Sequence, residues 1–120
     1  VAVLGAAFKP FTDDTRDSPA LEVATRLHGL GAEVVVTDPK AIPNARRQHP
    51  QLGYEQELDR ALHGADAVLV VTEWNEYRHE LSPEHAGSLV KTKTVVDGRN
   101  CLDPAIWRAA GWEYRGMGRP

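Results

Sequence analysis

Three cationic side chains and one aromatic ring occupy positions where α/β proteins commonly bind phosphates. Phe8 and Lys9 follow the first apolar run of the chain, Arg16 precedes the first predicted helix, and Arg99 follows the apolar run over residues 94–97. An arginine guanidinium binds two phosphate oxygens at once, whereas a lysine ammonium acts as a movable point charge. Together, these side chains are of the types that would hold a diphosphate.

The net charge of the chain predicts that any anionic ligand is held by a few placed cations. The 120 residues carry a formal net charge of -3, with 42% hydrophobic and 26% charged residues, which is typical of one compact globular domain. Such a chain has no basic surface for nucleic acid and no apolar stretch of membrane-spanning length. Its single Cys101 excludes an internal disulfide, so we expect a cytoplasmic protein.

Residues that would catalyse a reaction are harder to find than residues that would bind a ligand. The five histidines show no metal-ligand spacing, and the chain contains neither a phosphate-binding P-loop nor the serine elbow of hydrolases. Cys101 has no histidine nearby in the sequence, and we interpret it as a small buried hydrophobic residue beside Leu102. We therefore predict no catalytic residue and no metal site in this chain.

Apolar runs rich in β-branched residues alternate with helical patterns, which is typical of βα units wound into a parallel sheet. The runs predict strands over Val1–Gly5, Glu33–Thr37, Ala67–Thr72, Thr94–Asp97 and Trp112–Arg115. Helices are predicted from Ser18-Pro19 to Gly31, over residues 55–62, near residues 83–90 and from Asp103-Pro104 to Gly111. Continuously apolar strands require helices on both faces of the sheet. The expected fold is α/β: a three-layer α/β/α, doubly wound, mainly parallel five-stranded sheet of Rossmann-like type.

The order of the strands decides which loops meet. Right-handed crossovers and the commonest winding give the spatial order 3-2-1-4-5, which places the first strand beside the strand over residues 94–97. Ligands of such sheets bind in the crevice between these two strands, at their carboxyl ends. We therefore expect Lys9 and Arg99 to face each other there as a clamp for a diphosphate, with Arg16 at the start of the adjacent helix. For each of the three alone, the alternative is an ordinary solvated surface cation.

The loop after the first strand does not have the pattern of a dinucleotide-binding loop. The second and third glycines of G-x-G-x-x-G are absent between Gly5 and Pro10, and Pro10 has no N–H to donate. Asp38 ends the second strand, where such folds carry a ribose-binding acid, but Pro39 follows it and we interpret Asp38 as a turn residue. NAD is therefore not expected to bind across this loop in the usual way.

Two further groups of side chains near this edge of the sheet have two interpretations each. Three acids precede the first predicted helix, namely Asp13, Asp14 and Asp17. They either interact with the positive end of the helix or orient Lys9 and Arg16 by ion pairing. Trp74 and Tyr77 follow the third predicted strand, where they either contact a base or a neighbouring domain or, more commonly, cover the core.

Several segments of the sequence, in order and with natural spacing, carry a family resemblance. They are GAAFKP (5–10), TDDTRDSPAL (12–21), GAEV (31–34) with DP (38–39), ADA (65–67) with TEW (72–74), and DGRN (97–100). Together they resemble the C-terminal domain of the UDP-glucose/GDP-mannose dehydrogenase family over nearly the whole chain. The resemblance implies that residues 1–120 form a single nucleotide-sugar (UDP) binding domain of a longer enzyme. A first residue that lies inside a strand pattern, without a methionine, fits that expectation.

The resemblance also implies an activity for the longer enzyme. Members of the family oxidise the C6 alcohol of a nucleotide sugar to a carboxylate in two hydride transfers to NAD, and UDP-glucose is the expected substrate. An N-terminal NAD-binding domain and a central region with the catalytic cysteine, lysine and acids would lie outside this chain. We therefore expect those domains as partners, a homodimeric parent enzyme, and no activity of the isolated chain.

Individual residues match the motifs of the family. Phe8 and Lys9 match its substrate-contacting Phe-Lys pair, and Arg99 matches the arginine of an Asp-Gly-Arg motif that reaches the sugar nucleotide. Arg16 matches an arginine that reaches the NAD bound by the other domain, whereas Phe11 stands where a polar residue is frequent. GDP-mannose and UDP-N-acetylhexosamine dehydrogenases share these motifs, so the nucleotide sugar stays open. A non-enzymatic module for nucleotide binding or dimerisation is the alternative from another class.

Overall fold

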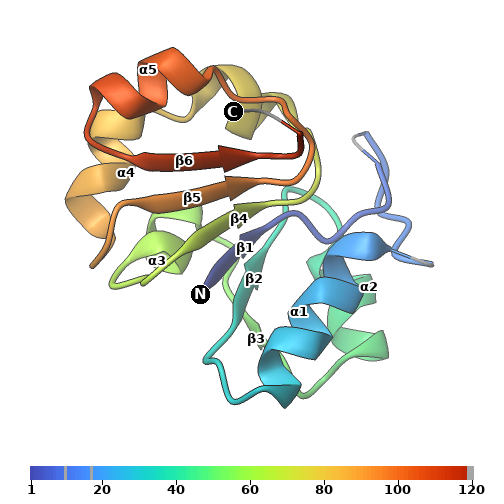
Figure 1. Cartoon of the computed structure of the whole chain (residues 1–120). Helices are drawn as coiled ribbons and strands as arrows, with labels where there is room; N and C mark the ends of the chain where they lie inside the picture. The colour runs from blue at the N-terminus through green and yellow to red at the C-terminus, as the bar shows by residue number, and fades with distance from the viewer. Residues whose placement is uncertain (10, 17, 119–120) are drawn as a thin grey trace.

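The computed structural model describes residues 1–9, 11–16 and 18–118 and has a central sheet between helices (Figure 1). Within these residues six strands pair in parallel, in the order β3-β2-β1-β4-β5-β6. Their bounds are β1 Ala2–Leu4, β2 Val35–Thr37, β3 Gly53–Tyr54, β4 Val68–Val70, β5 Thr94–Asp97 and β6 Glu113–Gly116. The predicted doubly wound α/β fold is confirmed, but the sheet has six strands where five were predicted.

The strand that the sequence did not predict is β3, which is only two residues long. It pairs with β2, and the hydroxyl of Tyr54 fixes it further by donating to the carbonyl oxygen of Ala45, 3.0 Å away. Two residues contain no alternation that a sequence pattern would reveal. β3 takes the outer position that the prediction gave to the strand over residues 67–72.

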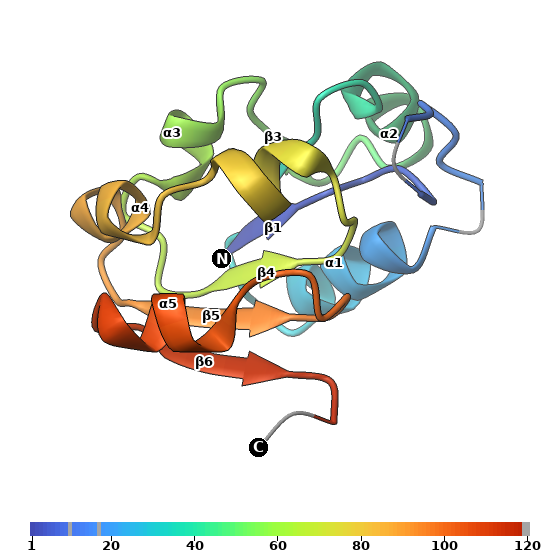
Figure 2. The ribbon, with the colours of Figure 1, turned by 90° about the horizontal axis from the view of Figure 1, so that it is seen from above.

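The corrected strand order moves the crevice where the winding reverses. β1 lies between β2 and β4, with Ala2 opposite both Val35 and Val68, and β5 is one strand further out. The predicted pairing of the first strand with residues 94–97 is therefore wrong, and the loops that meet at the reversal follow β1 and β4. Figure 2 shows β4, β5 and β6 pointing the same way, so the loops that follow them share one edge of the sheet.

Helices cover both faces of the sheet. They are α1 Pro19–Gly29, α2 Ile42–Gln48, α3 Leu58–Leu62, the π-helix η1 Glu76–Glu80, α4 Pro83–Leu89 and α5 Pro104–Ala109. In Figure 1, α1 and α2 lie on one side of the sheet and α3, α4 and α5 on the other, as right-handed crossovers require when the winding reverses. Neither α2 nor η1 was predicted, and neither has a side-chain cap that would mark its start. None of the helices in the described ranges is long and apolar enough to cross a membrane.

Capping residues fix where two of the helices begin, and therefore where the loops after β1 and β5 end. Ser18 accepts a hydrogen bond from the backbone N–H of Leu21 at the start of α1, with Pro19 as the first helical residue. Asp103 accepts one from the backbone of Ala105 at the start of α5, 3.0 Å away. Both helix starts agree with the prediction. Pro10 and Asp17, which entered the predictions above, lie outside the described residues.

Candidate functional site

The loops after β1 and β4 pack directly against each other where the winding reverses. Gly5 has a φ of +117°, and a Cβ atom there would lie 2.4 Å from the hydroxyl oxygen of Thr72. Thr72 is completely buried and donates from Oγ1 to the carbonyl oxygen of Ala7, 2.9 Å away. Both the backbone conformation and the close approach require glycine. The first glycine of the incomplete dinucleotide pattern thus serves packing between loops.

Asp38, at the end of β2, is 1% exposed and accepts hydrogen bonds from five N–H groups. The donors to Oδ1 are the backbone of Lys40 and Ala41 (2.8 Å each), and those to Oδ2 are the backbone of Ala6 (2.8 Å) and Ala7 (3.1 Å) and the indole Nε1 of Trp74 (3.0 Å). Such donors are what a buried carboxylate requires. Asp38 is therefore a turn residue, as predicted, and it also connects the loops after β1, β2 and β4.

The hydrogen bonds from Ala6 and Ala7 bear on dinucleotide binding. Loops that bind a pyrophosphate present free backbone N–H groups at the turn after the first strand. Here the Asp38 carboxylate already accepts from these two N–H groups, and both of its oxygens are occupied. The geometry supports the prediction that NAD does not bind across this loop in the usual way.

Trp74 and Tyr77 belong to the core, so of their two interpretations the structure favours covering the core over contact with a base or a neighbouring domain. Each is 2% exposed, and the Tyr77 hydroxyl donates to the carbonyl oxygen of Thr37, 3.3 Å away. Burial raises the pKa of Tyr77 well above its usual value. Phe11 is 72% exposed, has a φ of 66° and packs edge-on against Trp74 with 5.9 Å between ring centroids. The exposed aromatic ring at this place is therefore Phe11.

Asp97 shapes the loop after β5 in the way that Asp38 shapes the loop after β2. It is completely buried, and its carboxylate accepts four hydrogen bonds. Oδ1 accepts from the backbone N–H of Arg99 (3.2 Å) and from the Cys101 thiol (3.7 Å). Oδ2 accepts from the backbone N–H of Leu102 (2.8 Å) and from the Tyr114 hydroxyl (2.7 Å). Asn100 adds two hydrogen bonds with the backbone of Met117, both of 2.7 Å. The backbone that carries Arg99 is thus held from two sides.

Arg99 extends from the loop after β5 across the end of β4 to the loop after β1. Its Nη2 donates to the carbonyl oxygen of Phe8, 3.3 Å away, and its Nε and Nη2 lie 3.4 and 3.5 Å from the two carboxylate oxygens of Glu73. Neighbouring strands are only about 4.8 Å apart, so a long side chain spans the extra strand. The structure therefore brings Arg99 to the Phe8-Lys9 segment even though the predicted strand order was wrong.

Arg16 is paired with Asp14 within the loop after β1. Its Nε and Nη2 donate to the two oxygens of Asp14 at 3.1 and 3.0 Å, and 82% of the Arg16 side chain is exposed. These hydrogen bonds, with a smaller contribution from the charge of Lys9, lower the pKa of Asp14 to about 2. Asp14 thus orients Arg16, as one of the two interpretations predicted. Lys9 is exposed and lies within electrostatic range of Asp14.

Cys101 has the environment of a structural thiol. It is partly buried and its thiol donates to Asp97. Burial, with a further contribution from the negative charge of Asp97, raises the pKa of Cys101 to about 12. Because the thiolate is the nucleophilic form of cysteine, this thiol is unreactive at neutral pH.

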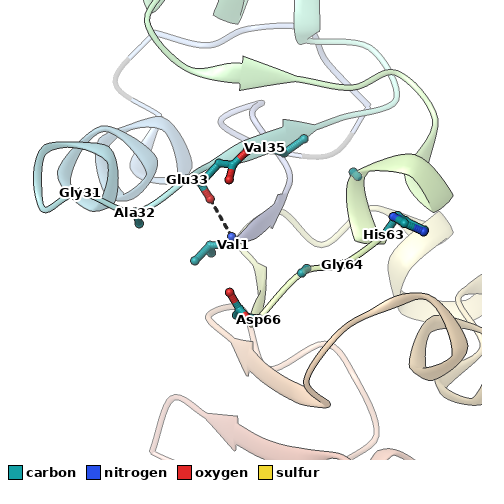
Figure 3. A pocket seen from close by; sticks show the side chains of 10 residues that line it. Val1, Gly31, Ala32, Glu33, Val35, His63, Gly64 and Asp66 are labelled. Atoms are coloured by element: carbon teal, nitrogen blue, oxygen red, sulfur yellow. Dashed lines mark hydrogen bonds between the residues drawn. The ribbon is translucent and has the colours of Figure 1, made fainter.

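A hollow of about 390 Å³ lies at the opposite edge of the sheet, beside Val1 and the turns at Gly31 and Gly64. Figure 3 shows it with the amino group of Val1 donating to the carbonyl oxygen of Glu33, 2.7 Å away. None of the predicted site residues lines this hollow. Glu33 and Asp66 at its rim repel a diphosphate, so the carboxyl ends of the strands remain the candidate site.

The sequence analysis did not assign a role to Glu73. It follows β4 by a few residues and is the carboxylate that contacts Arg99. Glu73 stands between buried Thr72 and buried Trp74 in the segment after β4, but no sequence pattern indicates that its carboxylate contacts Arg99.

The sequence is similar to a known family and to individual known proteins over nearly its whole length. Residues 2–104 match the profile of the UDP-glucose/GDP-mannose dehydrogenase family, UDP binding domain. The chain is 38% identical over 122 residues to UDP-glucose 6-dehydrogenase YwqF of Bacillus subtilis (strain 168), covering 99% of this chain and 27% of that protein. It is 41% identical over 120 residues to UDP-glucose 6-dehydrogenase of Rhizobium meliloti (strain 1021), covering 100% and 27%. The chain therefore spans about a quarter of the length of these relatives.

Solved structures show the same fold. A UDP-glucose dehydrogenase from Pyrobaculum islandicum superimposes with a TM-score of 0.75 and 35% identity, over 94% of this chain and 24% of that one. An NDP-N-acetyl-D-galactosaminuronic acid dehydrogenase from Methanosarcina mazei Go1 superimposes with a TM-score of 0.85 and 28% identity, over 98% and 24%. Both structures are of much longer chains.

Proposed function

Because the chain belongs to the UDP-glucose/GDP-mannose dehydrogenase family as its UDP-binding domain, we propose that it holds the UDP half of UDP-glucose for an NAD-dependent 6-dehydrogenase. The observation that carries this proposal is the position of Arg99. Its guanidinium lies beside the Phe8 carbonyl where the winding of the sheet reverses, which is the ligand-binding edge of doubly wound folds. A guanidinium is suited to bind two oxygens of a diphosphate.

The other predicted site residues have separate roles in this proposal. Phe8 is 46% exposed and would offer an aromatic surface in the loop whose backbone contacts Arg99. Lys9 is exposed in the same loop and supplies a movable positive charge for the diphosphate. Arg16 is held by Asp14 and directed into solvent, which supports a contact with NAD on another domain of the parent enzyme.

The parent enzyme would transfer hydride from the sugar to NAD with residues outside this chain. The Cys101 thiol is neutral at pH 7, and the peptide groups of Ala6 and Ala7 are occupied by Asp38. This domain would therefore position the substrate, while an N-terminal domain binds NAD and a central region reacts. A homodimeric, cytoplasmic parent accords with the free thiol of Cys101.

Calorimetric titration of the chain with UDP, UMP, GDP and sulfate tests the proposed function. We expect UDP to bind more tightly than UMP, because the second phosphate adds contacts with Arg99 and Lys9. A scaffold without a nucleotide site would show only weak association with all four anions, and this association would disappear as the salt concentration rises. Preference for GDP over UDP would instead favour a GDP-sugar dehydrogenase.

An activity assay tests where the reacting groups lie. The chain alone, mixed with UDP-glucose and NAD, should produce no NADH at any pH, because the proposal assigns the reacting groups to other domains of the parent enzyme. Near neutral pH the Cys101 thiol of this chain is also not ionised. Measurable NADH formation would contradict the assignment of catalysis to other domains.

A further inference from the structure

Glu73 is placed where a ligand phosphate would be expected. Its two carboxylate oxygens lie 3.4 Å from Nε and 3.5 Å from Nη2 of Arg99, one oxygen on each nitrogen. This side-on geometry is the one by which an arginine binds two oxygens of a carboxylate or a phosphate. Glu73 therefore occupies the binding edge of the guanidinium that the proposed function assigns to the diphosphate.

The contact between Glu73 and Arg99 is weak. Hydrogen bonds between a cationic nitrogen and an anionic oxygen are usually about 2.7–2.9 Å long, and both distances here are longer. About a third of each side chain is exposed, so solvent and salt screen the attraction. By contrast, the Arg16 contacts with Asp14 are 3.0 and 3.1 Å long. Arg99 is thus held at the ends of the strands by an interaction that a stronger anion can replace.

Bound diphosphate and ionised Glu73 cannot both use this edge of Arg99. A diphosphate carries more charge than a carboxylate and would repel it at this distance. We infer, on the basis of the proposed function, that the Glu73 carboxylate holds Arg99 in the unliganded domain and is exchanged for a ligand phosphate on binding. Glu73 then lowers the affinity of Arg99 for anions, because an anion must compete with it to reach Arg99.

The exchange has the same consequence for every anion. Every ligand loses the same Glu73 contact when it binds, so the ion pair raises the dissociation constants of UDP and of inorganic phosphate by the same factor. A ligand with several other contacts, such as UDP, then still binds at low concentration, whereas an anion with few contacts does not. Neutralising Glu73 should consequently improve the binding of UDP and of inorganic phosphate alike.

The test is calorimetric titration of the chain with UDP and with inorganic phosphate, using Glu73→Gln, Arg99→Ala and the double variant. Exposed ion pairs contribute about 0.2–1 kcal/mol, so Glu73→Gln should lower the dissociation constant for UDP roughly 1.4- to fivefold. The same substitution in the Arg99→Ala background should leave it unchanged. Glu57→Gln is the control. Glu57 is the residue before α3 and lies 3.4 Å from Arg60 Nε, which is the same distance as that between Glu73 and Arg99 Nε.

The outcomes separate this inference from the proposed function. Tighter UDP binding by Glu73→Gln, lost in the double variant and absent from Glu57→Gln, supports the exchange. Unchanged or weaker binding by Glu73→Gln, while Arg99→Ala still impairs binding, overturns the exchange and leaves the proposed function intact. Equal binding by Arg99→Ala and the unmodified chain, or no UDP binding at all, overturns both. Thermal melting of each variant verifies that the fold is retained.

Discussion

Two clusters at the carboxyl ends of the strands differ in how their charges are satisfied. The Asp38 cluster consists of Asp38 and its five N–H donors, all within 3.1 Å of a nearly inaccessible carboxylate. The Arg99 cluster consists of Arg99, Glu73 and the Phe8 carbonyl, with contacts of 3.3–3.5 Å between partly exposed groups. The contacts of the Asp38 cluster are short and mostly buried, whereas those of the Arg99 cluster are longer and partly exposed.

This difference fits our proposal that the first cluster is a scaffold and the second a binding site. Buried hydrogen bonds to a charge are costly to break, because the groups left behind have no water to bind. Partly exposed contacts can exchange partners at lower cost, because water and salt already compete for them. The Asp38 cluster therefore fixes the loops, whereas in the proposal the Arg99 cluster exchanges Glu73 for an anion.

The largest expected effect comes from removing the buried carboxylate. Asp38→Ala leaves five N–H groups, four of them in buried hydrogen bonds, without their acceptor, so we expect a loss of about 3–5 kcal/mol in the free energy of unfolding, measured by urea denaturation. Asp66→Ala is the control, because Asp66 is 68% exposed and 3.9 Å from Lys91; it should cost less than about 0.5 kcal/mol. Equal effects of the two substitutions would mean that Asp38 is no scaffold.

The next effect concerns binding and should leave stability unchanged. Arg99→Ala removes the guanidinium at the ligand edge, so UDP binding should weaken by about 1.5–3 kcal/mol, the range of hydrogen bonds to charged groups. The free energy of unfolding should change by less than about 0.5 kcal/mol. Arg115→Ala, which breaks the exposed pair with Glu113, should alter neither quantity. A loss of stability without a loss of UDP affinity would reverse the distinction between the two clusters.

A comparison of two buried tryptophans refines the picture of the Asp38 cluster. Trp74 Nε1 donates to the charged Asp38 carboxylate at 3.0 Å, whereas Trp112 Nε1 donates to the neutral carbonyl of Pro83 at 2.9 Å. Hydrogen bonds to charged groups are the stronger, so Trp74→Phe should lower the free energy of unfolding by about 1 kcal/mol more than Trp112→Phe. Thermal or urea denaturation of both variants measures the two free energies of unfolding. Equal losses would indicate that Asp38 gains little from the indole.

The smallest expected effect is a pH dependence of the stability of the fold, which arises from Asp14 in the exposed part of the loop after β1. Hydrogen bonds from Arg16 lower the pKa of Asp14 from 3.8 to about 2 in the folded chain. A lowered folded-state pKa stabilises the fold above the unfolded value, and this contribution is lost as the pH falls from 3.8 towards 2. NMR titration of the Asp14 carboxyl should show the low pKa, and Arg16→Gln should bring it back towards 3.8. An unchanged pKa in Arg16→Gln would contradict the pairing.

The sequence predicted those elements whose local signals are strong. Apolar runs identified β1, β2, β4 and β5, the segment Trp112–Arg115 identified β6, and Ser18-Pro19 and Asp103-Pro104 marked two helix starts correctly. β3 and α2 were missed because a two-residue strand and a helix without a side-chain cap carry no comparable signal. Overlooking β3 was enough to make the predicted strand order wrong.

The candidate site was predicted in part, although the strand order on which the prediction rested was wrong. Lys9 and Arg99 were expected to face each other because their strands were expected to be neighbours. The structure brings Arg99 to the carbonyl oxygen of Phe8, the residue before Lys9, although β4 lies between those strands. Glu73 was not assigned a role, because no sequence pattern says which carboxylate an arginine will contact. Asp38 was recognised as a turn residue, but its bonds to Ala6, Ala7 and Trp74 join segments more than thirty positions apart.

By itself, the sequence determined the α/β class, the helix caps and the cationic residues at strand ends, because each depends on neighbouring residues and their periodicity. Only the tertiary structure decided which strands lie side by side, which carboxylate is buried among N–H donors, and which one faces the exposed guanidinium. These outcomes depend on contacts between distant segments, whose hydrogen bonds and desolvation are settled when the sheet closes around its core.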